Sequence, residues 1–121
     1  MKHSPISSLY VHFPFCEAKC HYCDFYSIGQ ERTRAGDPDR FEAALKREVE
    51  QLGSRLSPAL ETIFFGGGTP SMTPPDAMAR ALEPIWRHTS VSASTEWTME
   101  ANPSSIERER MKAYRALGVN R

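Results

Sequence analysis

The three cysteines of the chain lie in one short segment, at Cys16, Cys20 and Cys23, in a C-x3-C-x2-C spacing. Three thiolates so close together can hold three corners of a [4Fe-4S] cluster, which needs four ligands for complete coordination. One iron would then keep an open position, which distinguishes metal sites that perform chemistry from sites that only support structure. The spacing therefore predicts a reactive iron–sulfur site on a loop that covers residues 14–26.

Two other interpretations of the cysteines stay open at this point. A structural zinc site could use the three thiolates with His12 or His21 as the fourth ligand, although zinc sites more often combine separated C-x2-C pairs. The thiols could also be unrelated core residues, since free cysteine is commonly buried. Their clustering beside the charged residues Glu17 and Lys19 argues against that second alternative.

Two further segments carry residues that could take part in a site. Gly66-Gly67-Gly68-Thr69-Pro70 has no lysine in the phosphate-loop position and does not fit G-x-G-x-x-G, so it does not indicate a nucleotide phosphate site. Alone it predicts a tight turn, although glycines also let the backbone approach a ligand closely. The other segment is Glu100-Ala101-Asn102-Pro103.

The elements that position these segments form a βαβαβα pattern, which predicts an α/β fold with a parallel sheet. Short apolar runs predict strands at residues 9–13, 62–65 and 94–101. Helical patterns follow them at residues 37–52, from a cap at Thr73, and from a capping box of Ser104 and Glu107 to Leu117. The inward positions of the first two helices are Phe41, Leu45, Val49, Leu52, Met78, Leu82 and Ile85.

The order of these elements predicts that the three segments lie together. The cysteines follow the first strand, the glycines follow the second, and Glu100 closes the third. In a parallel sheet the carboxyl ends of the strands share one edge, where α/β proteins build their sites. We therefore expect one site at that edge.

The last three residues, 119–121, would begin a fourth strand. The repeat therefore reads as a truncated piece of a larger protein. The alternative is a small, complete three-stranded α/β domain.

Composition narrows the class of protein. The chain has 121 residues with 15 basic and 15 acidic side chains, which argues against nucleic-acid binding. No apolar run approaches the roughly 18 residues of a transmembrane segment. No secretory signal is evident, so we expect a cytoplasmic protein.

Taken together, four segments closely resemble the radical S-adenosylmethionine enzymes of the oxygen-independent coproporphyrinogen III oxidase family. The resemblance covers residues 9–121 and rests on Tyr10-Val11-His12-Phe13-Pro14-Phe15-Cys16, the cysteine loop, Gly66-Gly67-Gly68-Thr69-Pro70-Ser71 and Glu100-Ala101-Asn102-Pro103. It implies that residues 1–121 are the N-terminal part of a radical SAM core domain, the first three βα units of a partial (β/α)6 barrel, with the remaining barrel and a C-terminal domain absent.

The resemblance also implies roles for individual residues. Cys16, Cys20 and Cys23 would ligate the [4Fe-4S] cluster, and the amino and carboxylate groups of S-adenosylmethionine would chelate the open iron. The implied cofactor contacts are Tyr10, Tyr22, Gly67, Gly68, Thr69 and Glu100. For Tyr10, ordinary packing within a strand remains an alternative.

The resemblance supports two activities, and the zinc-stapled structural module remains a third hypothesis. Within the family, the closest match is to the heme chaperones, which bind heme and pass it to acceptor hemoproteins. The oxidases, which decarboxylate coproporphyrinogen III, carry a further cysteine two residues after the third, where this chain has Phe25. No heme ligand can be assigned among His3, His12, His21 and His88.

Overall fold

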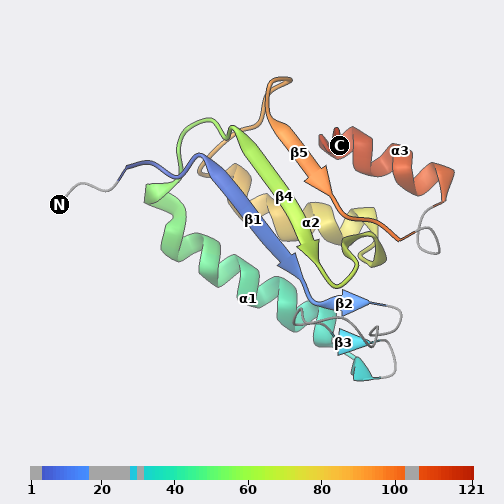
Figure 1. Cartoon of the computed structure of the whole chain (residues 1–121). Helices are drawn as coiled ribbons and strands as arrows, with labels where there is room; N and C mark the ends of the chain where they lie inside the picture. The colour runs from blue at the N-terminus through green and yellow to red at the C-terminus, as the bar shows by residue number, and fades with distance from the viewer. Residues whose placement is uncertain (1–3, 17–27, 30–31, 103–106) are drawn as a thin grey trace.

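The computed structural model describes residues 4–16, 28–29, 32–102 and 107–121 (Figure 1). In chain order, the elements are β1 (Ser8–Phe13), β2 (Phe15–Cys16), β3 (Ile28–Gly29), α1 (Asp37–Leu52), the 3-10 helix η2 (Gly53–Arg55), β4 (Thr62–Gly67), the 3-10 helix η3 (Pro70–Met72), α2 (Pro75–Trp86), β5 (Glu96–Met99) and α3 (Arg108–Leu117).

The main sheet has three parallel strands in the order β1-β4-β5. Leu9 lies opposite Ile63, and Ile63 lies opposite Trp97, so the strands are in step across the sheet. The chain passes from β1 to β4 through α1 and from β4 to β5 through α2 (Figure 1). The predicted α/β fold with a parallel sheet is therefore confirmed.

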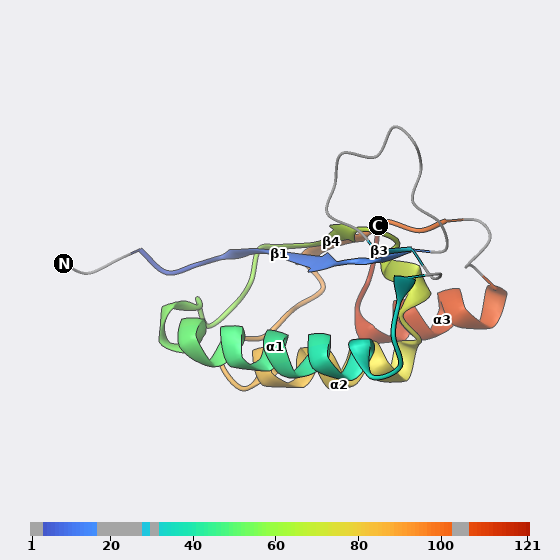
Figure 2. The same cartoon turned by 90° about the horizontal axis from the view of Figure 1, so that it is seen from below.

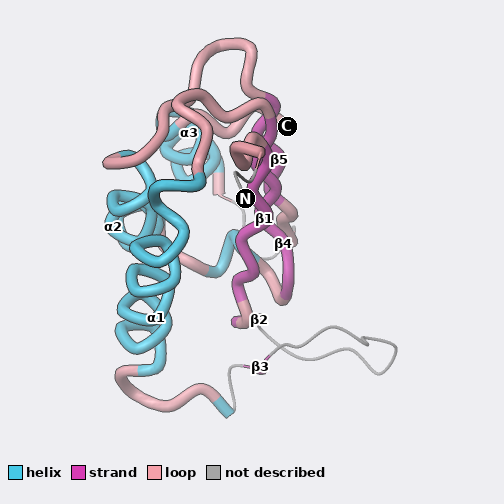
Figure 3. Tube along the Cα trace, turned by 90° about the vertical axis from the view of Figure 1, so that its left-hand side faces the viewer, coloured by secondary structure: helices cyan, strands magenta, loops and turns pink. Residues whose placement is uncertain are grey.

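The helices α1, α2 and α3 cover the same face of the sheet, as Figures 2 and 3 show from two directions. Alternate strand residues point into this layer because successive side chains of a strand face opposite sides. The core combines Val11, Phe13, Ile63, Phe65 and Trp97 of the strands with Val49, Met78, Leu82, Ile85 and Tyr114 of the helices. Burying one such side chain contributes roughly 1.5–3 kcal/mol, so this layer is the main source of stability.

The predicted inward positions of the first two helices agree with the core. Val49, Met78, Leu82 and Ile85 are buried, and Phe41 and Leu45 pack at the edge of the core. Leu52 is only partly buried, at the last turn of α1.

A second, two-stranded sheet lies beyond the carboxyl end of β1. β2 pairs with β3 in parallel, with Phe15 opposite Ile28 and Cys16 opposite Gly29. The amide N–H of Ile28 also donates to the carbonyl oxygen of Pro14 at 2.6 Å. The chain thus leaves this point at Cys16 and returns beside it at Ile28.

Two predicted helix starts are wrong. α2 begins at Pro75 with Pro74 as its N-cap, not at a Thr73 cap. Thr73 and Pro74 each precede a proline, which disfavours helical backbone, and both are extended. α3 begins at Arg108 because Glu107 is still extended, at φ −109° and ψ 154°. Ser104 of the predicted capping box lies outside the described residues.

The end of the chain runs beside β5. The amide N–H of Arg121 donates to the Trp97 carbonyl oxygen at 3.1 Å, and the Met99 N–H donates to the Arg121 carbonyl oxygen at 3.0 Å. This alternation is the hydrogen-bond pattern of a parallel pair, as the predicted fourth strand requires. Among the described helices, none is long and apolar enough to cross a membrane.

Candidate functional site at the carboxyl edge of the sheet

Cys16 at the start of the cysteine segment, the glycine segment and Glu100 all lie at the carboxyl edge of the sheet. The amide N–H of Gly68, after β4, donates to the carbonyl oxygen of Phe13 at the end of β1, at 2.6 Å. The N–H of Glu100, after β5, donates to the carbonyl oxygen of Phe65 in β4, at 3.0 Å. Backbone hydrogen bonds therefore tie the end of each strand to its neighbour, and we call this edge the rim.

Cys16 lies at the rim as the second residue of β2. Its side chain is buried, and the residue before it, Phe15, accepts a 2.7 Å hydrogen bond from the N–H of Thr69. The start of the cysteine segment is thus fastened to the glycine segment. Cys20, Cys23 and Tyr22 lie outside the described residues, as do His3, His21 and Phe25.

The glycine segment owes its composition to close backbone packing. Gly67 has φ +111°, and a Cβ there would lie 2.5 Å from the Phe13 carbonyl oxygen. A Cβ on Gly68 would lie 2.6 Å from the Phe15 carbonyl oxygen. A side chain at either position would push the segment away from the strand that leads to Cys16.

The hydrogen bonds of this segment also limit which ligand groups it can take. The N–H groups of Gly68 and Thr69 both donate to backbone carbonyl oxygens. These two donors are therefore committed within the protein, and the segment would meet a ligand through oxygen acceptors. Such acceptors suit an amino group, which donates hydrogen bonds.

Tyr10 lies on the sheet surface that the described helices leave uncovered, close enough to Glu100 to be influenced by its charge. Tyr10 is 56% exposed, its ring stacks on Phe64 with centroids 5.9 Å apart, and its hydroxyl lies 3.1 Å from Nδ1 of His12. Partial burial raises the pKa of Tyr10, and the nearby Glu100 carboxylate raises it further. The Tyr10 hydroxyl therefore stays protonated and can donate a hydrogen bond near an acidic side chain.

Phe64 is a site neighbour that the sequence analysis did not single out. It is 39% exposed and lies opposite Tyr10 in the sheet register. Strand alternation could have identified it, because Phe64 stands between Ile63 and Phe65 and must face the other side. Gly66 leaves room for this aromatic pair, since a Cβ there would approach both rings to within 2.9–3.1 Å.

A polar network behind the rim, centred on buried Ser71 and Tyr114, also went unpredicted. It joins Ser71 in η3 to Asn102 after β5 and to Arg110 and Tyr114 in α3. Ser71 belongs to the motif that carries the family resemblance, but its partners lie 31 to 43 residues away in the sequence. Helical periodicity alone could have placed only Tyr114 on an inward face.

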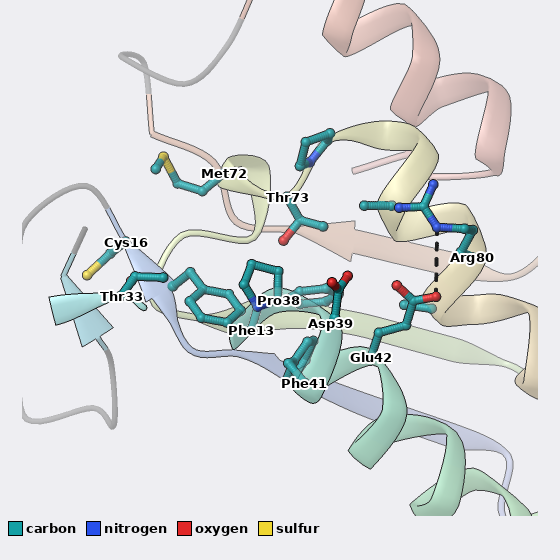
Figure 4. Close-up of a pocket in the computed structure, with 14 residues that line it drawn as sticks. Phe13, Cys16, Thr33, Pro38, Asp39, Phe41, Glu42, Met72, Thr73 and Arg80 are labelled. Carbon is teal, nitrogen blue, oxygen red and sulfur yellow. Dashed lines mark ion pairs between the residues drawn. The ribbon is translucent and has the colours of Figure 1, made fainter. Parts of the chain in front are cut away.

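A cavity of about 230 Å³ borders Cys16 from the helix side of the sheet. Its lining includes Phe13, Phe15, Phe41 and Met72, and Figure 4 shows Cys16 toward one end and the Arg80–Glu42 ion pair, at 3.8 Å, toward the other. Apolar walls of this kind control the access of water to a metal site.

The histidines considered in the sequence analysis separate in space. His12 lies at the rim beside Tyr10. His88 packs against Gly53, where its ring atoms would be within 2.8 Å of an added Cβ, at the other end of the helical layer. Within the described ranges there is no group of three histidine, cysteine or acidic residues that could hold a metal ion.

The fold and the rim together define the class of protein. A parallel α/β layer places a cysteine, a glycine-rich turn and a glutamate at the carboxyl ends of successive strands. The sequence profile of the radical SAM superfamily matches residues 10–121, and the chain belongs to this superfamily. Membership implies S-adenosylmethionine and an iron–sulfur cluster as cofactors.

Two individual proteins are similar to this chain over almost its whole length. The Bos taurus protein named "Radical S-adenosyl methionine domain-containing protein 1, mitochondrial" is 42% identical over 121 residues, which cover 95% of this chain and 26% of the relative. The heme chaperone HemW of Escherichia coli K12 is 38% identical over 117 residues, which cover 97% of this chain and 31% of the relative.

A solved structure is also similar. The coproporphyrinogen III oxidase HemN from Escherichia coli, described as a radical SAM enzyme, superposes with a TM-score of 0.83 and 28% identity, covering 97% of this chain and 27% of HemN. The chain thus spans about a quarter to a third of the length of the relatives it matches.

Proposed function

We propose that this chain is the cofactor-binding part of a heme chaperone similar to HemW, which binds heme and transfers it to acceptor hemoproteins. The observation that carries the proposal is the rim itself, where Cys16, the glycine segment and Glu100 converge on the scaffold of this superfamily. The choice of chaperone over oxidase is supported by 38% identity to HemW of Escherichia coli, against 28% to HemN of the same organism.

The described residues fit the two cofactors. Cys16 would ligate the cluster together with Cys20 and Cys23, and its place at the rim, where the preceding residue is hydrogen-bonded to Thr69, suits a cluster ligand that must lie near S-adenosylmethionine. When bound, the reduced cluster and S-adenosylmethionine supply one-electron cleavage of a carbon–sulfur bond. The protein must bind the two groups, orient them and exclude competing reactions.

The rim offers complementary groups to S-adenosylmethionine. The segment Gly67–Thr69 would accept hydrogen bonds from the methionine amino group, because the N–H groups of Gly68 and Thr69 are already used within the protein. The Glu100 carboxylate and the Tyr10 hydroxyl would make polar contacts from the neighbouring strands, and Tyr22 would contribute from the cysteine loop. A cytoplasmic location remains a prediction.

The second candidate is the oxidative decarboxylation of coproporphyrinogen III, which the similarity to HemN favours. Phe25 stands where the oxidases carry a further cysteine, and this difference supports the chaperone.

The test uses the full-length protein after anaerobic purification. The proposal expects iron and sulfide in the protein, S-adenosylmethionine binding, a heme complex and transfer of heme to an apo-hemoprotein, without protoporphyrinogen formation. Turnover of coproporphyrinogen III would overturn the chaperone proposal in favour of the oxidase. Zinc without iron and sulfide would reject both candidates and support the structural zinc module.

A further inference from the structure

Ser71 links the two rim segments that follow β4 and β5. It is the middle residue of η3, two residues after Thr69, and it is fully buried. Its hydroxyl oxygen accepts a hydrogen bond from the N–H of Asn102 at 3.3 Å, two residues after Glu100. The pairing of β4 with β5 ends at Phe65 and Met99. The Ser71 side chain therefore adds a contact between the two segments beyond the paired part of the strands.

Ser71 is in turn held by α3. The hydroxyl group of Tyr114 lies between the carbonyl oxygens of Ser71, at 3.1 Å, and Thr73, which is closer. Nη1 of Arg110, one helical turn before Tyr114, donates to the same Ser71 carbonyl oxygen at 3.0 Å. The backbone of η3 is therefore fastened to α3 at a point 43 residues away in the sequence.

These contacts matter for the proposed cofactor site, which lies between the glycine segment and Glu100. A ligand that binds between two segments requires their separation to be fixed, typically to about 0.5 Å. Gly67–Thr69 leads directly into η3, and Glu100 leads directly to Asn102. A shift of η3 would move the first segment. Loss of the Ser71 hydroxyl would leave the second segment tied to β4 only through the Glu100–Phe65 backbone hydrogen bond. The network thus adds a second restraint on the distance between the two segments.

We propose that Ser71 and Tyr114 are positioning residues for S-adenosylmethionine, which hold Gly67–Thr69 and Glu100 at the separation that the cofactor requires. The inference rests on the proposed cofactor site. Neither side chain is exposed at the rim, since both are buried, so they act through the segments they hold. Cluster ligation does not depend on them, because Cys16 is hydrogen-bonded to neither side chain and is held separately by the pairing of β2 with β3, opposite Gly29.

The experiment measures S-adenosylmethionine binding to the cluster-loaded, full-length protein by equilibrium dialysis. The variants are Tyr114→Phe, which removes only the hydroxyl group, and Ser71→Ala, which removes the acceptor for the Asn102 N–H. The first variant loses the donor to the Ser71 and Thr73 carbonyl oxygens and the second loses one part-buried hydrogen bond, so we expect the Kd for S-adenosylmethionine to rise about fivefold to tenfold. Iron and sulfide content should stay at the wild-type level.

Thr89→Val is the matched control. Thr89 donates its buried hydroxyl group to the Ser57 carbonyl oxygen at 2.6 Å, away from the rim, so the variant loses a similar hydrogen bond. We expect it to lower the melting temperature but to keep the wild-type Kd. A second measurement is the electron paramagnetic resonance spectrum of the reduced cluster, recorded with and without S-adenosylmethionine. We expect the cofactor to change the spectrum of the control protein. At the same cofactor concentration, the change should be smaller in the two variants.

Two outcomes would overturn the inference. One is wild-type affinity in Tyr114→Phe and Ser71→Ala, or in whichever of the two folds if the other does not. The other is an equal loss of affinity in Thr89→Val, which would indicate general destabilisation. A wild-type protein that binds neither cluster nor S-adenosylmethionine would instead refute the proposed function on which the inference depends.

Discussion

The backbone N–H of Gly68 donates a 2.6 Å hydrogen bond to the carbonyl oxygen of Phe13, and this contact joins the glycine segment to the strand that leads to Cys16. The contact exists because Gly68 has no Cβ, which would lie 2.6 Å from the carbonyl oxygen of Phe15. Gly68→Ala must therefore shift backbone on one side or the other. Overpacking of this kind costs about 1–3 kcal/mol of unfolding free energy.

We expect Gly68→Ala to lower cluster content as well as stability, because the displaced backbone precedes Cys16. Gly66→Ala is the comparison, since its added Cβ would meet the side chains of Phe64 and Tyr10, which can rotate away. Iron analysis and thermal unfolding of both variants provide the measurements. Equal cluster content in the two proteins would contradict the assigned role of Gly68.

The convergence of Cys16, Gly67–Thr69 and Glu100 could be predicted from the sequence. Each segment follows an apolar run, and the carboxyl ends of parallel strands share one edge whatever the details of packing. The three strands and the helical layer follow from the same local patterns. Local periodicity was sufficient to predict these strands and helices because each one shows its pattern within a few neighbouring residues.

The remaining features could not be predicted because they depend on distant contacts or on local exceptions. The β2–β3 pair is only two residues long in each strand, which is too short to show alternation. The start of α2 depends on two consecutive prolines, which keep Thr73 and Pro74 extended. The Ser71–Tyr114 contact requires α3 to pack against η3, so no pattern of neighbouring residues predicts it.

Cys16→Ala should abolish cluster assembly. Removing one of three thiolates leaves two protein ligands, which cannot hold a cubane cluster firmly. Visible absorbance after anaerobic reconstitution measures the loss, and Phe15→Leu, at the adjacent wall of the cavity, should retain the absorbance as a control. Wild-type absorbance in Cys16→Ala would refute its assignment as a ligand.

Tyr10→Phe separates cofactor contact from strand packing. The ring can still stack on Phe64, and the lost hydrogen bond to His12 is exposed, so the unfolding free energy should change by less than about 0.5 kcal/mol. If the hydroxyl group contacts S-adenosylmethionine, the Kd should rise about threefold or more. Equal Kd values for Tyr10→Phe and wild type would support packing as its role.

Phe64→Leu is the companion variant because it removes the aromatic stack and keeps the Tyr10 hydroxyl group. The loss of an aromatic pair costs about 0.5–1.5 kcal/mol, so this protein should be less stable than Tyr10→Phe. Chemical denaturation of both variants gives the comparison. Lower stability in Tyr10→Phe would contradict the exposed geometry of its hydrogen bond.

Tyr114 should make stability depend on pH in the alkaline range. Burial raises the pKa of its hydroxyl group above the usual value near 10, and this effect outweighs the nearby Arg110 guanidinium, which lowers the pKa. The folded protein therefore keeps the proton to higher pH than the unfolded chain does. The resulting stabilisation is complete below about pH 10 and is lost as the pH rises through the folded-state pKa.

Tyr114→Phe has no hydroxyl group to ionise at this position. The difference in unfolding free energy between this variant and wild type therefore separates the effect of Tyr114 from that of other groups that titrate at alkaline pH. We expect the variant to be less stable by about 1–2 kcal/mol between about pH 7 and pH 9, because buried carbonyl oxygens lose a donor. The difference should shrink above about pH 10, since Tyr114 of the unfolded wild-type chain then ionises while the folded protein still holds the proton, which favours unfolding. Urea unfolding of both proteins across this range measures it, and a difference that stays constant through pH 10 would show that the Tyr114 hydroxyl group is not held as a neutral donor.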